Sequence, residues 1–177
     1  MTESQQVWIS QLKQGNELAA FNLYNSYSQT MYNTLIRISG DTEAAKDLLQ
    51  EAFVKAFKRI EDLDDPKAFA GWLKRIVVNT GIEYTRKRKY EFEELNDERE
   101  EFAEEIAEDR FIEPDVLHSA IKELPDGCRT VLSLHLLEGY KHSEVAEELG
   151  ISESTSKTQY RHAKKLLKEK LHHLYAN

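Results

Sequence analysis

The sequence predicts an all-α protein of two small helical domains joined by an acidic linker, and three observations support this. Of its 177 residues, 40% are hydrophobic and 32% are charged, with only 7 glycines and 3 prolines, a balance typical of helix-rich globular chains. Apolar residues recur every three or four positions on both sides of the middle of the chain. Between these two parts, residues 91–115 hold 13 acidic and 2 basic residues, which indicates a domain boundary.

Charge divides the chain into three segments, residues 1–90, 91–115 and 116–177. The first holds 13 basic and 11 acidic residues and the last holds 9 and 8, so both are close to neutral. The net charge of −8 therefore comes from the middle segment, whose like charges repel and favour an extended or partly helical linker. Because the acidity is confined to the linker, the total charge does not exclude nucleic-acid binding by either domain.

The first domain is expected to begin with two helices. One ends at Gly40, and its apolar positions are Ala20, Phe21, Tyr24, Tyr27, Met31, Leu35 and Ile38. Asp41 or Thr42 caps the second helix. Its apolar stripe is dense enough to predict a core element and consists of Ala45, Leu48, Leu49, Ala52, Phe53, Ala56, Phe57 and Ile60.

A third helix is expected to begin at Asp65 and Pro66, because proline favours the first helical turn. Its inward positions are Phe69, Trp72, Leu73, Ile76, Val77 and Ile82. Since Trp72 lies in this stripe, core packing is a better interpretation for it than stacking on a nucleic-acid base. The helix ends in the basic run at residues 86–89, which is either a solvated terminus or a contact to phosphate.

The second domain is predicted to hold short helices and a helix-turn-helix. The Leu124-Pro125 step ends one helix, and Gly139 closes another that carries Val131, Leu132, Leu134, Leu136 and Leu137. From Ser143 to Leu171, two helices are joined by a turn at Gly150, with Ser152 positioned to cap the second. That second helix bears Lys157, Arg161, Lys164, Lys165, Lys168 and Lys170. This is the outline of a DNA-binding helix-turn-helix, although any amphipathic helical hairpin shares it.

The sequence carries no catalytic or metal-binding pattern. The six histidines lack metalloprotease spacing, and there is no phosphate-binding glycine loop or nucleophile elbow. The single Cys128 excludes an internal disulfide and a cysteine-based zinc cluster, and it predicts a packed or surface thiol in a reducing compartment. Residues 1–14 lack the features of a signal peptide, and no run is long enough to span a membrane. We expect a cytoplasmic protein without enzymatic activity, cofactor, metal or membrane insertion.

Three motifs follow one another along the chain. The first runs from Gly40 to Phe53, the second from Phe69 to Thr80, and the third from Leu124 to Ala163. In this order, with an acidic linker before the third, they resemble the extracytoplasmic-function sigma factors, small two-domain bacterial transcription initiation factors. The resemblance implies a sigma factor with a region 2 domain at residues 1–90 and a region 4 domain at residues 116–177.

The resemblance also implies partners and binding surfaces, with core RNA polymerase and promoter DNA as the partners. The residues expected to bind core polymerase are Asp47, Gln50, Glu51 and Lys55. Those expected at the promoter −10 element are Lys74, Arg75, Asn79, Arg86, Lys87, Arg88 and Lys89, with the loop from Glu61 to Ala68. Those expected at the −35 element are Ser154, Thr155, Lys157, Thr158 and Arg161. An anti-sigma factor that masks these surfaces is a further partner.

Two positions, Ser156 and Gln159, depart from the pattern common in the family. Ser156 at an inward position weakens packing slightly, and Gln159 either shifts base preference or reduces attraction to phosphate. The resemblance further implies that the acidic linker threads the polymerase, with its carboxylates in place of nucleic-acid phosphates. Two other functions stay open, namely a stand-alone helix-turn-helix regulator with an N-terminal effector or dimerisation domain, and a regulator-binding adaptor.

Overall fold

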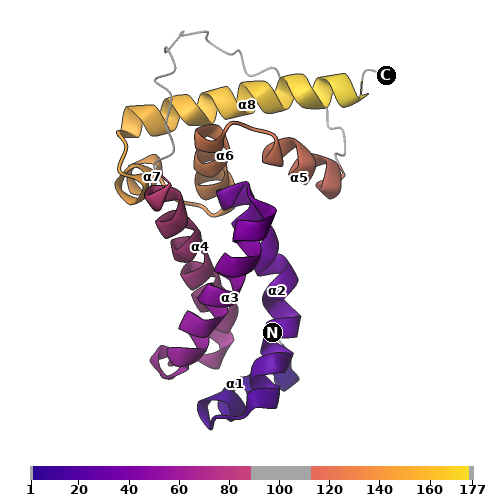
Figure 1. Cartoon of the computed structure of the whole chain (residues 1–177), viewed down its shortest axis with the longest axis vertical. Helices are drawn as coiled ribbons and strands as arrows, with labels where there is room; N and C mark the ends of the chain where they lie inside the picture. The colour runs from indigo at the N-terminus through magenta and orange to yellow at the C-terminus, as the bar shows by residue number, and fades with distance from the viewer. Residues whose placement is uncertain (1, 89–112, 176–177) are drawn as a thin grey trace. The chain divides into compact units, whose positions relative to one another are not determined.

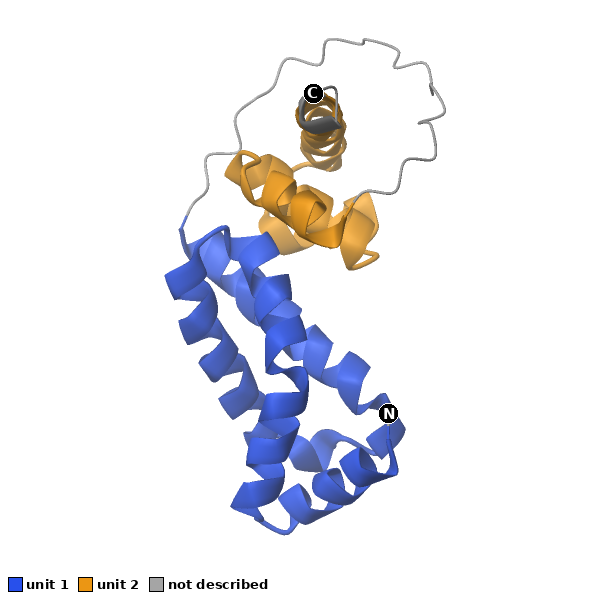
Figure 2. Ribbon diagram, turned by 90° about the vertical axis from the view of Figure 1, so that its right-hand side faces the viewer, with its two compact units in different colours: residues 1–88 blue, residues 89–177 orange. Residues whose placement is uncertain are grey.

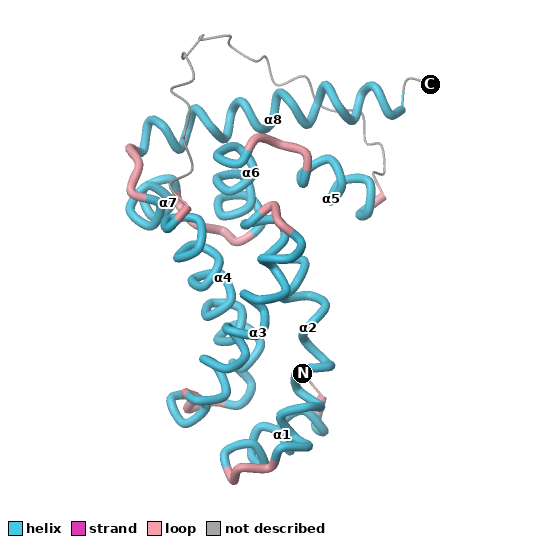
Figure 3. Tube along the Cα trace, viewed as in Figure 1, coloured by secondary structure: helices cyan, strands magenta, loops and turns pink. Residues whose placement is uncertain are grey.

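The computed structural model describes residues 2–88 and 113–175, with side chains as far as residue 172. These residues form helices and turns without a strand (Figure 3), as the sequence predicts. The chain divides into two compact units, residues 1–88 and 89–177 (Figure 2). Most of the predicted acidic linker, together with Lys89, lies outside the described residues. None of the described helices is both long and apolar enough to cross a lipid bilayer.

Unit 1 is a bundle in which three long helices pack against one another (Figure 1). A shorter helix precedes them in the chain, and it packs on the first long helix and on the turns that follow the second long helix. Two short 3₁₀ turns join the third long helix to the preceding one. The elements in chain order are α1 (Glu3–Lys13), α2 (Glu17–Ser39), α3 (Thr42–Lys58), η1 (Ile60–Asp62), η2 (Pro66–Ala68) and α4 (Phe69–Lys87).

Local chemistry sets the helix boundaries of unit 1 where the sequence predicts them. Gly40 adopts the left-handed φ of 69° that ends α2, and its N–H donates to the Ile36 carbonyl at 2.8 Å. The Asp41 carboxylate accepts hydrogen bonds from two backbone N–H groups of the first turn of α3 at 3.0 and 3.1 Å. The Asp65 carboxylate accepts from a backbone N–H of η2 and caps that turn. The helix start predicted at Asp65 and Pro66 is therefore the start of η2, and α4 begins three residues later, at Phe69.

The core of unit 1 forms where α2, α3 and α4 meet. Phe53 and Phe69 lie at its centre, with the Tyr24 ring 4.8 Å from the Phe53 ring. Trp72 is partly buried against this core, with its ring 6.0 Å from that of Phe69, as the sequence pattern predicts. The placement of Phe21 in the apolar face was wrong, because its side chain is 60% exposed.

The position of Phe21 follows from helix geometry. Ala19 and Leu23 are buried at 1% and 0% exposure, and they define the inner side of this turn of α2. Phe21 stands two residues from each of them, which turns it by about 200° to the opposite side. The predicted stripe included Phe21 and missed Leu23.

Unit 2 contains a helical hairpin supported by two shorter helices. Its elements are α5 (Pro114–Lys122), α6 (Asp126–Leu132), which continues into a π-helical turn η3 (Ser133–Leu137), α7 (His142–Leu149) and α8 (Glu153–Tyr175). Buried side chains of α5, α6 and α8 form a core that includes Ile121, Leu132 and Ala163. Leu136, which the sequence grouped with the neighbouring leucines, is 56% exposed, whereas Leu134, two positions earlier in η3, is fully buried.

Two glycines of α4 test the packing of unit 1. A Cβ at Gly81 would lie 3.1 Å from Ile38 Cγ2 and 3.3 Å from Leu35 Cδ2, whereas a Cβ at Gly71 would meet nothing within 4 Å. We expect Gly71→Ala to stabilise unit 1 by ~0.5–1 kcal/mol, since it gains helix propensity without a clash. Gly81→Ala should be less stable than Gly71→Ala by ~1–3 kcal/mol, because overpacking opposes the same gain.

The measurement is urea unfolding followed by tryptophan fluorescence. Both tryptophans of the chain, Trp8 and Trp72, lie in unit 1, so the signal reports that unit alone. Equal stability of the two variants would contradict the close approach of α4 to α2.

Candidate nucleic-acid and polymerase interface

The outer side of α4 carries the residues predicted for the −10 element. Arg75 and Asn79 are exposed and lie one turn apart, and Arg86 is exposed on the same side of the helix two turns further on. Lys74 is half-buried and borders this stripe. The opposite side is buried, with Leu73 and Val77 both at 0% exposure. The helix therefore separates a core face from a polar face that bears two arginines and an amide.

The three basic residues at the C-terminal end of α4 differ in their contacts. All three are exposed, and Arg88 also has contacts within unit 1. One guanidinium nitrogen of Arg88 donates to the Tyr84 hydroxyl at 2.8 Å and lies 3.6 Å from a carboxylate oxygen of Asp41. The pKa of Asp41 is lowered, first by the N–H groups that it caps and last by Arg88. Arg88 thus ties the end of α4 to the start of α3.

The outer face of α3 carries the residues predicted to bind core polymerase. Asp47, Gln50 and Glu51 are exposed and share one side of the helix at spacings of three and four residues. Lys55 is half-buried and bridges two helices, with its ammonium 2.9 Å from Glu51 and 3.0 Å from Glu83 of α4. The hydrogen bond to Glu51 is the main reason why the pKa of Lys55 is raised. Lys55 therefore links the surfaces of α3 and α4 by ion pairs, beside the apolar core that packs the two helices.

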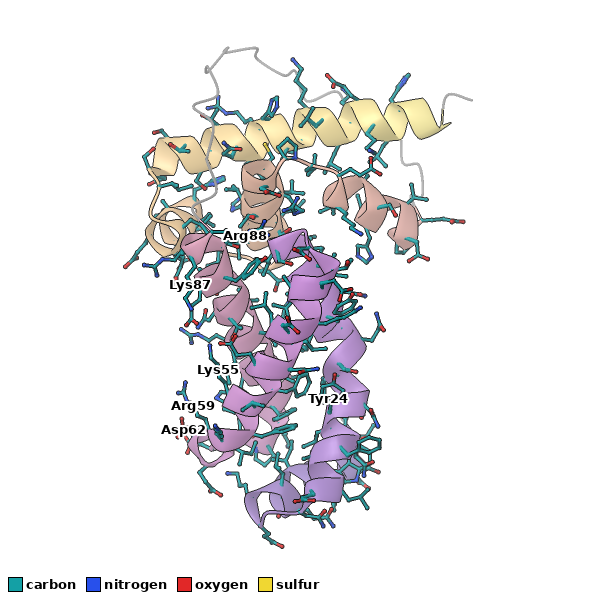
Figure 4. The ribbon with its side chains drawn as sticks, in the orientation of Figure 1. Tyr24, Lys55, Arg59, Asp62, Lys87 and Arg88 are labelled. Carbon is teal, nitrogen blue, oxygen red and sulfur yellow. The ribbon has the colours of Figure 1, made fainter. Side chains whose placement is uncertain are left out.

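The loop between α3 and α4 lies at the far end of unit 1 from Lys87 and Arg88, as the labelled Arg59 and Asp62 show (Figure 4). Arg59 Nε donates to an Asp62 carboxylate oxygen at 2.9 Å and closes the first turn of the loop. The Leu63 carbonyl accepts a hydrogen bond from the ammonium of Lys13, at 2.7 Å. Sequence reasoning missed Lys13, because a contact to a backbone carbonyl 50 residues away leaves no pattern in the sequence.

The helical hairpin of unit 2 has the turn that the sequence predicts. Gly150 closes α7 with a φ of 68°, and the Ser152 hydroxyl accepts from the Thr155 N–H at 3.0 Å to cap α8. At the start of α7, the Glu144 carboxylate accepts from the Lys141 N–H at 2.7 Å. These contacts fix both helices of the hairpin at their first turns.

The residues predicted for the −35 element share one side of the first turns of α8. Ser154, Lys157 and Arg161 are exposed, and Thr155 and Thr158 are half-buried beside them. Lys157 lies 2.6 Å from Glu153, and this contact lowers the pKa of Glu153. A guanidinium nitrogen of Arg161 donates to the Thr158 hydroxyl at 3.4 Å.

The inner side of α8 corrects the expectation for Gln159. Gln159 is only 3% exposed, and its side-chain oxygen accepts from the Cys128 thiol at 3.0 Å. Because its side chain points into the core, the expectation that Gln159 shifts base preference was wrong, whereas reduced attraction to phosphate stays a prediction. Ser156 is fully buried at 0% exposure, and its hydroxyl lies 2.9 Å from His142 Nδ1. Ser156 is thus inward, as predicted, and it has a hydrogen-bond partner.

Comparison with known proteins assigns the chain to a family. It matches the family models of Sigma-70 region 2 over residues 23–90 and Sigma-70 region 4 over residues 115–167. The RNA polymerase sigma factor SigV of Bacillus subtilis is 30% identical over 159 residues, which cover 90% of this chain and 95% of SigV. The ECF RNA polymerase sigma factor SigW of the same species is 29% identical over 179 residues, 94% of this chain and 96% of SigW. The chain belongs to the extracytoplasmic-function group of the sigma-70 family.

Sigma-70 proteins are transcription initiation factors. Helices α3 and α4 lie within the region 2 match, and the first turns of α8 lie within the region 4 match. The fold is shared with CnrH in its complex with the cytosolic domain of CnrY, at a TM-score of 0.50 and 22% identity over 96% of this chain and 97% of that chain. Because both matched relatives align along nearly their whole length, a stand-alone helix-turn-helix regulator is not favoured.

Region 4 of this sigma factor contains an aromatic cluster that the sequence did not predict. The rings of His135 and His142 stack with centroids 3.9 Å apart, and the Tyr160 ring lies edge-on 4.8 Å from His135. His135 Nδ1 lies 2.7 Å from the Tyr140 carbonyl, so this nitrogen carries the proton and donates it. The residues come from η3, α7 and α8, which is why no local sequence pattern marks them.

The pKa of His142 is lowered, chiefly by burial and then by His135 and Lys157, against an opposing effect of Glu153. Folded region 4 therefore binds a proton at His142 less readily than the unfolded chain does. As the pH falls below the ordinary histidine pKa of 6.5, the unfolded state takes up the proton first, and region 4 loses stability.

We expect this loss to be larger in the wild-type chain than in His142→Gln, whose amide can still bond to Ser156. The measurement is hydrogen exchange of backbone amides in α7 and α8 at about pH 7.5 and about pH 5.5, corrected for intrinsic exchange rates. An equal loss of protection in both proteins would show that His142 does not carry this pH dependence.

Proposed function

We propose that this sigma factor divides promoter recognition between its two units. Residues 1–90 bind core RNA polymerase and the −10 element, residues 116–177 bind the −35 element, and residues 91–115 form an acidic linker between them. The observation that supports this division is that α3 and α4 carry separate exposed polar faces, so one unit can hold polymerase and DNA at the same time.

In this proposal the polymerase docks on α3. Asp47, Gln50 and Glu51 are exposed and offer acceptors and a donor on one side of the helix, and they are not needed for the core. Lys55 contributes at the edge of this surface and keeps it aligned with α4 through Glu83. Truncating such exposed polar residues should weaken docking without unfolding the domain.

The −10 element is proposed to bind along α4. The amide of Asn79 can donate to and accept from the edge of an unstacked base, and Lys74 and Arg75 lie beside it to hold the strand. Arg86 and Lys87 are positioned for backbone phosphates of the neighbouring duplex. Arg88 extends this basic run but contributes less, because it already binds Tyr84 and Asp41.

The −35 element is proposed to bind the first turns of α8. A helix that follows a tight turn can enter the major groove with its N-terminal residues against base edges. Arg161 has the donor geometry for a base edge or a phosphate, and Lys157 would exchange Glu153 for a phosphate. Ser154, Thr155 and Thr158 supply hydroxyls on the same side.

An anti-sigma factor is a proposed regulator, and the protein is proposed to act in the cytoplasm without catalytic activity of its own. Leu18, Phe21 and Val54 are 66%, 60% and 51% exposed on α2 and α3. Leu18 and Phe21 lie one turn apart on α2, and we propose that this exposed apolar pair contacts the partner.

The test is run-off transcription by core RNA polymerase and the purified chain on a template pool randomised at the −10 and −35 positions. Changing Gln50 and Glu51 together to Ala should weaken core association by about tenfold, equivalent to ~1.4 kcal/mol. Asn79→Ala should leave core association within about twofold but lower promoter opening by about tenfold, since one base contact is lost.

Glu43→Gln, an exposed change on the first turn of α3, is the matched control and should transcribe like the wild type. Equal effects of the α3 and α4 variants on core association and on opening would contradict the division of labour. Absence of transcripts from every template with the wild-type chain would contradict the proposed function itself.

A further inference from the structure

Helix α1 supports the loop that joins α3 to α4. It lies outside residues 23–90, the part that matches region 2. It contacts both short turns of the loop, η1 and η2. Its Lys13 ammonium donates to the Leu63 carbonyl at 2.7 Å, at the point between the two turns. The loop is thus connected to a helix that is distant in sequence.

Helix α1 packs on the core of unit 1 and is capped at its start. Ile9 is fully buried in the core of unit 1, and Trp8 and Leu12 pack partly buried against the same core. Thr2 and Gln5 cap the start of the helix through reciprocal hydrogen bonds. Lys13 therefore extends from the last turn of a helix that is fixed at both its cap and its apolar face.

The Leu63 carbonyl lies between the two 3₁₀ turns, where the backbone direction of the loop changes. The Leu63 side chain is buried at 3% exposure, and its N–H donates to the Ile60 carbonyl at 3.2 Å, which completes η1. After Leu63 the chain turns at Asp64 and re-enters 3₁₀ geometry at Pro66. A charge-assisted bond to this carbonyl fixes the peptide plane from which the second half of the loop departs.

We propose that Lys13 is a positioning residue for −10 recognition, which rests on the proposed binding of the −10 element by residues 1–90 and on the part in it that the family resemblance implies for the loop from Glu61 to Ala68. Lys13 bonds to the Leu63 backbone, so in this proposal it acts on the DNA through the loop. Its bond keeps the exposed second half of the loop in the one orientation in which an unstacked base is read. Recognition elements need such support, because a loosely held site loses discrimination before it loses binding.

Two other roles for Lys13 make different predictions. If Lys13 only stabilised unit 1, its loss would lower activity on all templates in proportion to the unfolded fraction. If Lys13 bound a phosphate directly, its loss would weaken DNA binding uniformly across sequences and reduce the salt dependence. A positioning role changes the preference among −10 bases while the salt dependence stays the same.

The experiment uses the full chain with core polymerase and templates randomised at each −10 position. Lys13→Met keeps the alkyl length and removes the donor, and it should lower the ratio between the preferred and the next base at one or two −10 positions by about fivefold, or ~1 kcal/mol. Lys13→Arg keeps a charged donor and should retain the wild-type ratio within about twofold. Lys46→Met removes an exposed lysine that pairs with Glu43 on the surface of α3, and it should retain that ratio as well.

Core association, tryptophan-detected unfolding and the salt dependence of promoter binding are measured on the same variants. An unchanged base preference in Lys13→Met would overturn the positioning role, and so would a loss that is uniform over all sequences. If the wild-type chain transcribes and Lys13→Met discriminates normally, only this inference fails. If the wild-type chain does not transcribe at all, the proposed function fails with it.

Discussion

The close packing of α4 on α2 at Gly81 sets the orientation of every other residue of α4. An added Cβ there would lie only 3.1 Å from Ile38, so the two helices approach at a position where the chain has no side chain. With Leu73 and Gly81 turned toward the core, the helical period of 3.6 residues turns Arg75 and Asn79 to the outside. The side of α4 proposed to bind DNA is therefore a consequence of how α4 packs on α2.

Region 4 fixes its exposed face by different means. The inner side of α8 carries polar groups, and each is matched, with Gln159 accepting from Cys128 and Ser156 bonded to His142. A buried polar group is costly unless it has a partner, so only one rotation of α8 against α6 and α7 satisfies both pairs. This rotation also determines that Lys157 and Arg161, rather than their neighbours, are exposed.

Local chemistry made the helix boundaries predictable from the sequence. Gly40 and Asp41 act within one turn of their own positions, so neighbouring residues were enough to identify them. The inner and outer sides of α2 were harder to predict. Phe21 was assigned to the wrong side, because the presence of an aromatic residue alone does not distinguish the two faces of an amphipathic helix. Gln159 and Lys13 could not be assigned, since their partners are distant in sequence and one of them is a backbone carbonyl. The roles of the polymerase-facing and DNA-facing residues stay predictions.

A sigma factor reads its promoter as part of RNA polymerase, and the near-neutral charge of residues 1–90 and of residues 116–177 suits weak binding of DNA by each part alone. The most direct measurement is fluorescence anisotropy of a labelled duplex, carrying −10 and −35 elements selected by transcription, titrated with the chain alone and with the chain bound to core polymerase. We predict sequence-specific binding only with the polymerase, and its loss when either element is scrambled. Tight, sequence-specific binding of a palindromic site by the chain alone would contradict this account.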